Sequence, residues 1–323
     1  MTCRSLFTDI ITGIFILIAY ISRLERYLIF IPSSVIHGFT LGVALIIALN
    51  QLNFAFGLSA IPIHETFMKN MVESLLHLPE MAFSAFLVFT LFLSSLFVLL
   101  MLRPTFPGII IIAPFGIVLG YCAGTGVLPL TLATLETKFG FIEGKLIELP
   151  TLCFDSSMVT TGIAVAIVAI LETMISAKIA DRMTKTTHDE RKEMLGLGLA
   201  NIASGFLGGI PATAALARTA LNVRSGATHK IAQGISSIVT AVISLFFLKY
   251  FSYMPLAVIA AILVFVAARM IEREHFLHLW HEERHSFWLA LLVAALCLLE
   301  DPIVGIFAGT AASFIMQARR GNA

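Results

Sequence analysis

Glu172 is a carboxylate near the middle of an otherwise apolar run, residues 159–180. A charge at membrane depth costs several kcal/mol, so such a residue usually faces a cavity or a partner. Ser176 lies four residues further on and therefore shares a helix face with Glu172. Together they can supply two oxygen ligands to a sodium ion, or the carboxyl can take up and release a proton. The alternative is a packing carboxyl that is bonded to a neighbouring hydroxyl.

A second feature lies at residues 208–211, where two glycines precede Ile210 and Pro211. This pattern breaks one helix, and proline suits the first turn of the next. The new helix is predicted over 211–223, and its length of roughly 20 Å is too short for a hydrocarbon core of ~30 Å. A half-helix that starts at the midplane directs N–H groups and the positive end of its dipole toward an anion. The alternative is close packing of helices through small residues.

Glu172 and this half-helix together form a pattern that is typical of secondary transporters, in which broken helices meet at the membrane midplane. Arg218 is the basic residue inside the half-helix. Its charge adds positive potential near an anion, or its guanidinium binds backbone carbonyls. The two features therefore favour a site for an anion and a coupling cation.

Residues 281–285 match H-E-x-x-H, the pattern of zinc metalloproteases. They lie in a charged connection between two apolar segments, with no motif for a third ligand. The cysteines are far apart and show no C-x-x-C spacing; they are Cys3, Cys122, Cys153 and Cys297. We therefore expect a chance match, with no enzyme activity, metal site or organic cofactor.

The amino-acid composition indicates that Glu172 and the half-helix lie within a membrane protein. Of 323 residues, 58% are hydrophobic and 13% are charged, with a mean hydropathy of +0.94. A soluble domain carries roughly 25% charged residues, and a disordered chain is poor in aromatic residues. A net charge of +1 gives no reason to expect nucleic acid as a partner. The chain is therefore an integral membrane protein.

Eleven apolar segments predict an all-α membrane protein. They lie near 5–22, 32–50, 81–102, 107–124, 159–180, 194–210, 211–223, 230–250, 255–271, 286–299 and 302–317. In the long connection 51–80, residues 67–76 favour a short amphipathic helix at the membrane surface. Lys and Arg gather on alternate connections, and this bias predicts that Met1 lies outside and the C-terminus lies in the cytoplasm.

Several sequence blocks resemble the sulfate permease (SulP) family. The specific part runs from Glu172 to Gly226, and a further block marks the entry to the family's fifth helix. The blocks are LETMISA (171–177), ADRMTKT (180–186), GLGLANIAS (196–204), GGIPAT (208–213), ARTALNVRSG (217–226) and RYLIFIP (26–32).

The resemblance implies fourteen helices in two inverted repeats of seven, a core domain and a gate domain that move against each other, and substrate bound between half-helices three and ten. Our eleven segments then correspond to helices 4–14. Residues 1–323 form one transmembrane transporter domain, with part of the first repeat at 5–158 and the second repeat at 159–317. The cytoplasmic STAS domain and helices one to three are not expected in this sequence.

Carried over residue by residue, Glu172 and Ser176 match positions that bind the coupling ion in sodium-dependent bicarbonate members. The anion is expected at the half-helix, at Thr213, Ala214, Ala215, Leu216, Ala217 and Arg218. Leu216 replaces a hydroxyl residue of the sodium site, which leaves proton coupling open, and Ala217 offers only its backbone.

We therefore expect secondary transport of a small inorganic anion, of the sulfate or bicarbonate class, coupled to H⁺ or Na⁺. The expected setting is a bacterial inner membrane, and a homodimer is expected from the family. Two alternatives stay open, an inactive fragment of such a transporter and a nucleobase transporter of related fold. The latter usually carries a second acid on its tenth helix, which residues 211–223 lack.

Overall fold

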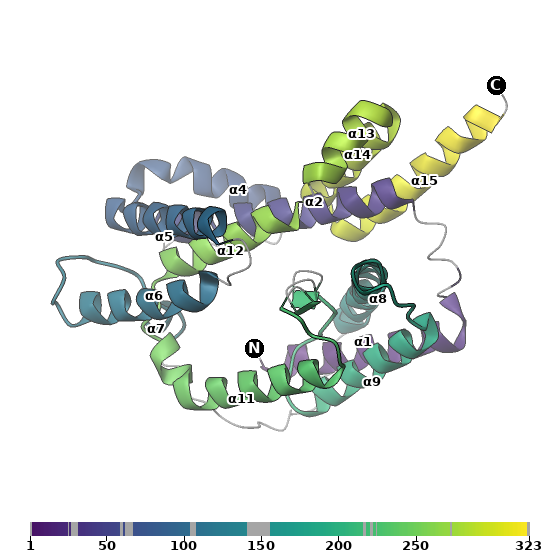
Figure 1. Cartoon of the computed structure of the whole chain (residues 1–323). Coiled ribbons are helices and arrows are strands. Elements are labelled where there is room, and N and C mark those ends of the chain that lie inside the picture. The colour runs from purple at the N-terminus through teal and green to yellow at the C-terminus, as the bar shows by residue number, and fades with distance from the viewer. Residues whose placement is uncertain are drawn as a thin grey trace. The chain divides into compact units, whose positions relative to one another are not determined.

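The computed structural model describes residues 2–24, 26, 32–58, 61, 67–103, 108–140, 156–215, 218–219, 222–223, 225–271 and 273–321. Within these residues, helices occupy every expected membrane segment except the start of 211–223 (Figure 1). They are α1 (Thr2–Ile21), α2 (Ser33–Leu49), α5 (Phe83–Leu102), α6 (Gly108–Gly124), α8 (Ser156–Thr184), α9 (Glu190–Phe206), α11 (Ile231–Phe251), α12 (Leu256–Met270), α14 (Arg284–Leu299) and α15 (Pro302–Gly321). The all-α prediction is confirmed.

Several helices have the length and composition of membrane spans. In the described part of the chain, the stretches long and apolar enough to cross a bilayer are Ser33–Ala55, Phe83–Leu102, Ser157–Lys178 and Ile231–Phe251. Shorter apolar helices cover Phe7–Ile21, Gly108–Gly124, Arg284–Leu299 and Pro302–Met316. A segment that crosses lipid must pair its backbone N–H and C=O groups within the protein, and an α-helix pairs them within itself.

Shorter elements fill the connections. They are α3 (Leu52–Ala55), α4 (Phe67–Leu76), the 3₁₀ turn η2 (Leu78–Glu80), α7 (Leu135–Phe139) and α13 (Arg273–Glu282). α4 confirms the helix predicted in the connection 51–80. Thr134 caps the start of α7, because its hydroxyl accepts from the N–H of Thr137 at 3.4 Å.

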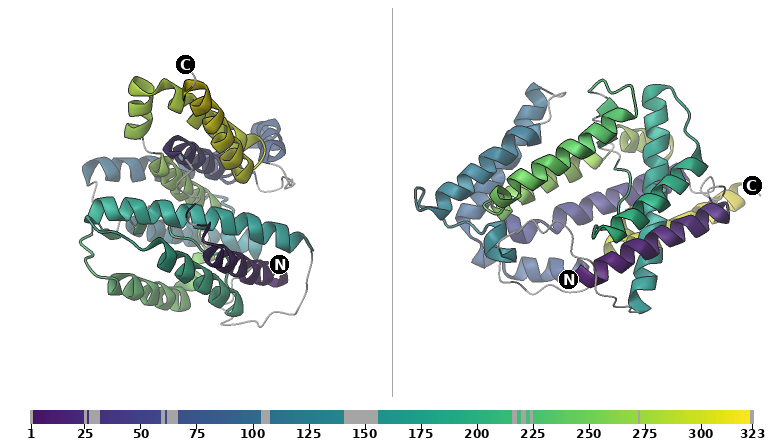
Figure 2. Two further views of the ribbon diagram at one scale, coloured as in Figure 1. Left: turned by 90° about the vertical axis from the view of Figure 1, so that its right-hand side faces the viewer. Right: turned by 90° about the horizontal axis from the view of Figure 1, so that it is seen from below.

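The chain divides into two units, and each unit takes segments from both predicted repeats. Unit 1 comprises Met1–Pro32 and Lys145–Ala232, and unit 2 comprises Ser33–Gly144 and Gln233–Ala323. In unit 1, α1 packs along both α8 and α9 (Figures 1 and 2). Buried apolar residues join the three helices at Ile16, Ala19, Ala166, Ala169, Ile170, Met174 and Met194.

Glycines allow α1 and α9 to approach each other closely. A Cβ added to Gly13 would lie 2.6 Å from Cγ1 of Ile202 and 2.8 Å from the carbonyl oxygen of Gly198. A Cβ added to Gly198 would lie 2.7 Å from Cδ2 of Leu17. The two helices therefore meet backbone to backbone, with small residues on the interface as in other membrane helix pairs.

Unit 2 is built around α2 and α12. α2 contacts α12, α14 and α15, and α12 contacts α5 (Figure 1). The buried cluster between α5 and α12 contains Ala85, Val88, Phe92, Ala257, Val258 and Ala261. α11 differs from the other spans, because none of its described residues is buried. Its apolar side chains suit contact with lipid.

Candidate functional site

The segment between α9 and the next helical turn is non-helical over residues 209–215. α9 ends at Phe206. The carbonyl of Ala215 accepts hydrogen bonds from the N–H groups of Arg218 and Thr219, both at 3.1 Å. Helical bonding therefore starts near Ala215, and the prediction that the helix begins at Pro211 is wrong.

Asn201 is one physical reason for this difference. Its side chain is fully buried on α9. Its Nδ2 donates to the carbonyls of Ala212 at 3.0 Å and Leu197 at 2.9 Å, and its Oδ1 accepts from the Ala212 N–H at 2.8 Å. Both backbone groups of Ala212 are thus satisfied without a helix. Because backbone groups in a membrane must be paired, this amide stabilises the non-helical segment.

Groups of α8 form hydrogen bonds to the next two residues, Thr213 and Ala214. The Ala214 N–H donates to Oγ1 of Thr173 at 3.3 Å, and the Thr173 and Thr213 hydroxyls are 3.1 Å apart. The Thr213 hydroxyl donates to the Ala169 carbonyl at 3.1 Å. Ser176 donates from Oγ to the Ala214 carbonyl at 2.9 Å. These bonds form a continuous network in which each hydroxyl hydrogen has an acceptor.

Glu172 lies on the α8 face that carries this network. Positions 169, 172, 173 and 176 repeat at the three- and four-residue spacing of one helix face. Glu172 is half-buried, and within the described part of the chain no hydrogen bond or ion pair to its carboxylate is found. Ser176 is 1% exposed and keeps its oxygen lone pairs after donating to Ala214. The structure therefore places a carboxylate and a hydroxyl oxygen beside the non-helical segment.

The predicted anion-site residues take different positions. Thr213 and Ala214 use their hydroxyl and N–H, respectively, in the bonds to α8. The carbonyl of Ala215 closes the first helical turn. The side chain of Arg218 is exposed. Leu216 and Ala217 lie outside the described residues.

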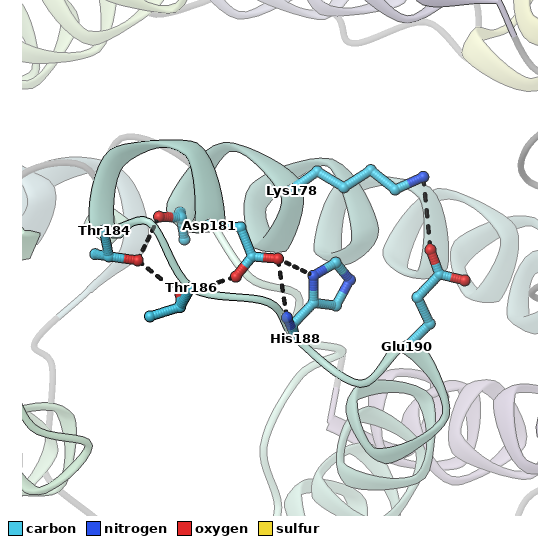
Figure 3. Close-up of polar contacts among 7 residues, drawn as sticks. Lys178, Asp181, Thr184, Thr186, His188 and Glu190 are labelled. Carbon is cyan, nitrogen blue, oxygen red and sulfur yellow. Dashed lines mark hydrogen bonds and ion pairs between the residues drawn. The ribbon is translucent and has the colours of Figure 1, made fainter.

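The connection between α8 and α9 is organised around Asp181 (Figure 3). Its Oδ2 accepts from the ring Nδ1 of His188 at 2.7 Å and from the His188 N–H at 2.9 Å, and its Oδ1 accepts from the Thr186 hydroxyl at 3.0 Å. Lys178 Nζ lies 3.6 Å from Glu190 Oε1. The hydrogen bond from the His188 ring is the main reason that the pKa of Asp181 lies below its usual 3.8. The charged turn predicted here is therefore an ordered connection.

The H-E-x-x-H match does not form the geometry of a zinc protease. His281 belongs to the last turn of α13, and His285 belongs to the first turn of α14. Glu283 lies between the two helices, and its Oε2 accepts from the Ser286 hydroxyl at 2.8 Å. The protease motif needs both histidines on one face of one helix, and here the helix is interrupted.

Three polar residues of unit 1 were missed by the sequence analysis. Asn201 and Thr173 anchor the non-helical segment, and Asp9 is a fully buried carboxylate in α1. Each is a polar residue within an apolar segment, which is the signal that identified Glu172. Asp9 could have been identified in this way, because it is a carboxylate inside the predicted apolar segment 5–22.

The chain belongs to the sulfate permease family, whose model matches residues 4–293. It is similar to the "Putative sulfate transporter YvdB" of Bacillus subtilis (strain 168), with 31% identity over 319 residues that cover 98% of this chain and 59% of the relative. It is also similar to the "Bicarbonate transporter BicA" of Picosynechococcus sp., with 26% identity over 95% of this chain and 54% of the relative. The chain thus spans little more than half the length of these relatives, which carry the names of transporters rather than enzymes.

Solved structures show the same fold. The transmembrane domain of a cyanobacterial bicarbonate transporter BicA matches with a TM-score of 0.80 and 21% identity, over 94% of this chain and 77% of that chain. The murine Slc26a9 anion transporter in its inward-facing state matches with a TM-score of 0.82 and 18% identity, over 98% of this chain and 52% of that chain. The helices described above therefore have the fold of the transmembrane domains of these transporters.

Proposed function

We propose that the protein takes part in secondary active transport of a small inorganic anion of the sulfate or bicarbonate class, coupled to H⁺ or Na⁺. The observation that carries the proposal is the non-helical segment 209–215, bonded to the α8 face that holds Glu172. The names of the relatives, sulfate and bicarbonate transporters, support this class of substrate. A bacterial inner membrane, a cytoplasmic C-terminus and a homodimer belong to the same proposal.

Glu172 is proposed to bind the coupling cation, with Ser176 as a second oxygen ligand. A charged group at membrane depth is costly unless it is paired, so binding a cation offsets that cost. Because Ser176 also holds the Ala214 carbonyl, cation binding and the position of the non-helical segment share one hydroxyl. This shared contact gives a physical route from the cation to the anion.

The anion is proposed to bind where helical bonding starts, at residues 213–218. A helix start presents N–H groups and the positive end of its dipole. Arg218 adds positive potential near this position. Because Thr213 and Ala214 are already bonded to α8, their part is to hold the helix start in place.

All these groups belong to unit 1. We infer that unit 1 carries the cation and the anion together as one body during transport, as the family resemblance implies for a core domain. The bonds from α8 and α9 to the non-helical segment keep the site intact during such a movement.

Uptake by the purified chain in proteoliposomes tests the function. Labelled sulfate and labelled bicarbonate are offered separately, under an imposed sodium gradient or an imposed proton gradient. Uptake of one anion that is driven by one gradient identifies both the substrate and the coupling ion. Absence of uptake by well-folded protein under every gradient contradicts the proposal for this chain alone and favours the incomplete-transporter alternative.

A further inference from the structure

Asp9 is a buried carboxylate that the proposed transport site does not use. It lies on α1 and has no exposed surface, and among the described residues neither of its carboxylate oxygens has a hydrogen-bond partner. An ionised carboxylate without donors is very unfavourable in a low-dielectric interior. The group must therefore be neutralised by a bound proton or a bound cation.

The surroundings of Asp9 favour a proton. α1 packs against α8 and α9. At this level α8 contributes Gly162, whose carbonyl accepts from the Thr12 hydroxyl at 3.3 Å, and α9 contributes Ser204. A proton needs only one hydrogen-bond acceptor, such as the Ser204 hydroxyl oxygen, whereas no group of three metal-binding side chains is found in the described part of the chain.

The charged groups of the neighbouring helices lie far from Asp9. On α8, the described charged side chains begin with Glu172, ten residues beyond Gly162, or roughly 15 Å along the helix. The charged side chains of α9 lie in its first turn, more than two turns from Ser204. These residues are Glu190, Arg191, Lys192 and Glu193. The non-helical segment 209–215 has no titratable side chain. These elements therefore supply no counter-charge that would keep Asp9 ionised.

Ser204 connects Asp9 to the non-helical segment. Its side chain lies near the Asp9 carboxyl, and its hydroxyl donates to the carbonyl of Ile210 at 3.2 Å. The carbonyl of Ser204 also accepts from the Gly209 N–H at 2.8 Å. Ser204 thus fixes the beginning of the segment at the same point where it lies near the carboxyl.

We propose that Asp9 is a second proton-binding site, distinct from Glu172, which controls how the non-helical segment is held. Protonated Asp9 donates its carboxyl hydrogen to Oγ of Ser204, which keeps its own hydrogen on the Ile210 carbonyl. After the proton leaves to water, the carboxylate becomes the stronger acceptor and draws the Ser204 hydrogen to itself. The Ile210 carbonyl then loses its partner, and the segment is released at that end.

Infrared spectroscopy of the purified protein in lipid nanodiscs tests this proposal without any transport measurement. At neutral pH we expect the carbonyl stretch of a protonated carboxylic acid, lost in Asp9→Asn and kept in Glu172→Gln. Ser204→Ala retains Asp9 but removes its hydrogen-bond acceptor, so the band should shift in frequency. This second variant keeps the test valid if Asp9→Asn does not fold.

Two results would overturn the proposal. One is an acid carbonyl band that is unchanged in folded Asp9→Asn and in Ser204→Ala. The other is loss of the Asp9 band when sodium is added at constant pH, which would identify a metal cation as the ligand. Because the band is read without substrate, a failure of the proposed anion transport leaves this result unaffected.

Discussion

At the scale of single residues, hydrogen bonds from side chains replace helical bonding at the site. Asn201 satisfies both backbone groups of Ala212, while Thr173 and Ser176 satisfy those of Ala214. A short polar side chain that bonds the backbone offers it an alternative to helix. The segment therefore has a defined conformation although it has no regular secondary structure.

Replacing Asn201 with Ala should destabilise the protein. The change leaves the N–H and carbonyl of Ala212 without these partners, and losing the partners of such groups costs about 1–3 kcal/mol. Thermal unfolding in detergent measures the loss. Asn50→Ala is the matched control, because Asn50 is exposed in the turn after α2 and an exposed substitution changes stability by less than about 0.5 kcal/mol. Equal stability of the two variants would contradict the anchoring role.

Asp181 should make the stability of the protein depend on acidic pH. Its pKa in the folded protein is below the usual 3.8, chiefly because the His188 ring donates to it. A depressed folded pKa means that the stabilisation is present above the unfolded pKa and is lost as pH falls through the folded value. Unfolding temperatures measured during acidification below pH 3.8 should fall less in Asp181→Asn than in the wild type. Parallel curves for the two proteins would show that the Asp181 contacts do not contribute.

At the scale of elements, the close approach of α1 and α9 brings Asp9 near Ser204, and α8 packs against α1 beside them. Gly13 and Gly198 make this approach possible, since a Cβ at either position meets the facing helix at less than 3.0 Å. The apolar contacts of Ile16, Met174 and Met194 then bury the three-helix core. Helix packing in unit 1 thus fixes where the polar groups of the site meet.

Gly13→Ala should separate these helices. Added methyl groups in a close-packed interface usually cost about 1–3 kcal/mol, and here the neighbouring atoms include backbone of α9. Gly196→Ala on α9 is the matched control, because its Cβ meets nothing within 4 Å. That change should be neutral or stabilise by up to about 1 kcal/mol through helix propensity. Thermal unfolding compares the two, and a tolerated Gly13→Ala would show that the helices pack less closely than described.

At the scale of the whole molecule, the sequence predicted the helices well and part of the local backbone structure around the candidate site. Apolar runs define membrane helices because lipid requires internally paired backbone. The four-residue spacing of Glu172 and Ser176 correctly placed both on one face of α8. The start of the next helix was misplaced, because Pro211 is a local signal for a helix start, whereas Asn201 and Thr173 act through contacts that spacing alone does not show. The burial of Asp9 likewise depends on which face of α1 meets α9.

The division into two units is also a property of the folded chain rather than of its sequence order. Unit 1 joins α1 to α8 and α9 across more than a hundred residues, and unit 2 joins α2 to α14. Hydropathy marks the individual spans but does not say which spans pack together. The contacts show that every described residue of the proposed transport site belongs to unit 1.

The central claim is that Glu172 binds the coupling cation beside the anion segment. The most direct measurement compares anion uptake by the wild type, Glu172→Gln and Glu193→Gln in proteoliposomes, with the driving cation low and saturating. Glu193 is an exposed carboxylate on α9 and serves as the matched control. We predict that Glu172→Gln loses cation-driven uptake while Glu193→Gln behaves as the wild type. Unchanged uptake in Glu172→Gln at both cation levels would contradict the claim.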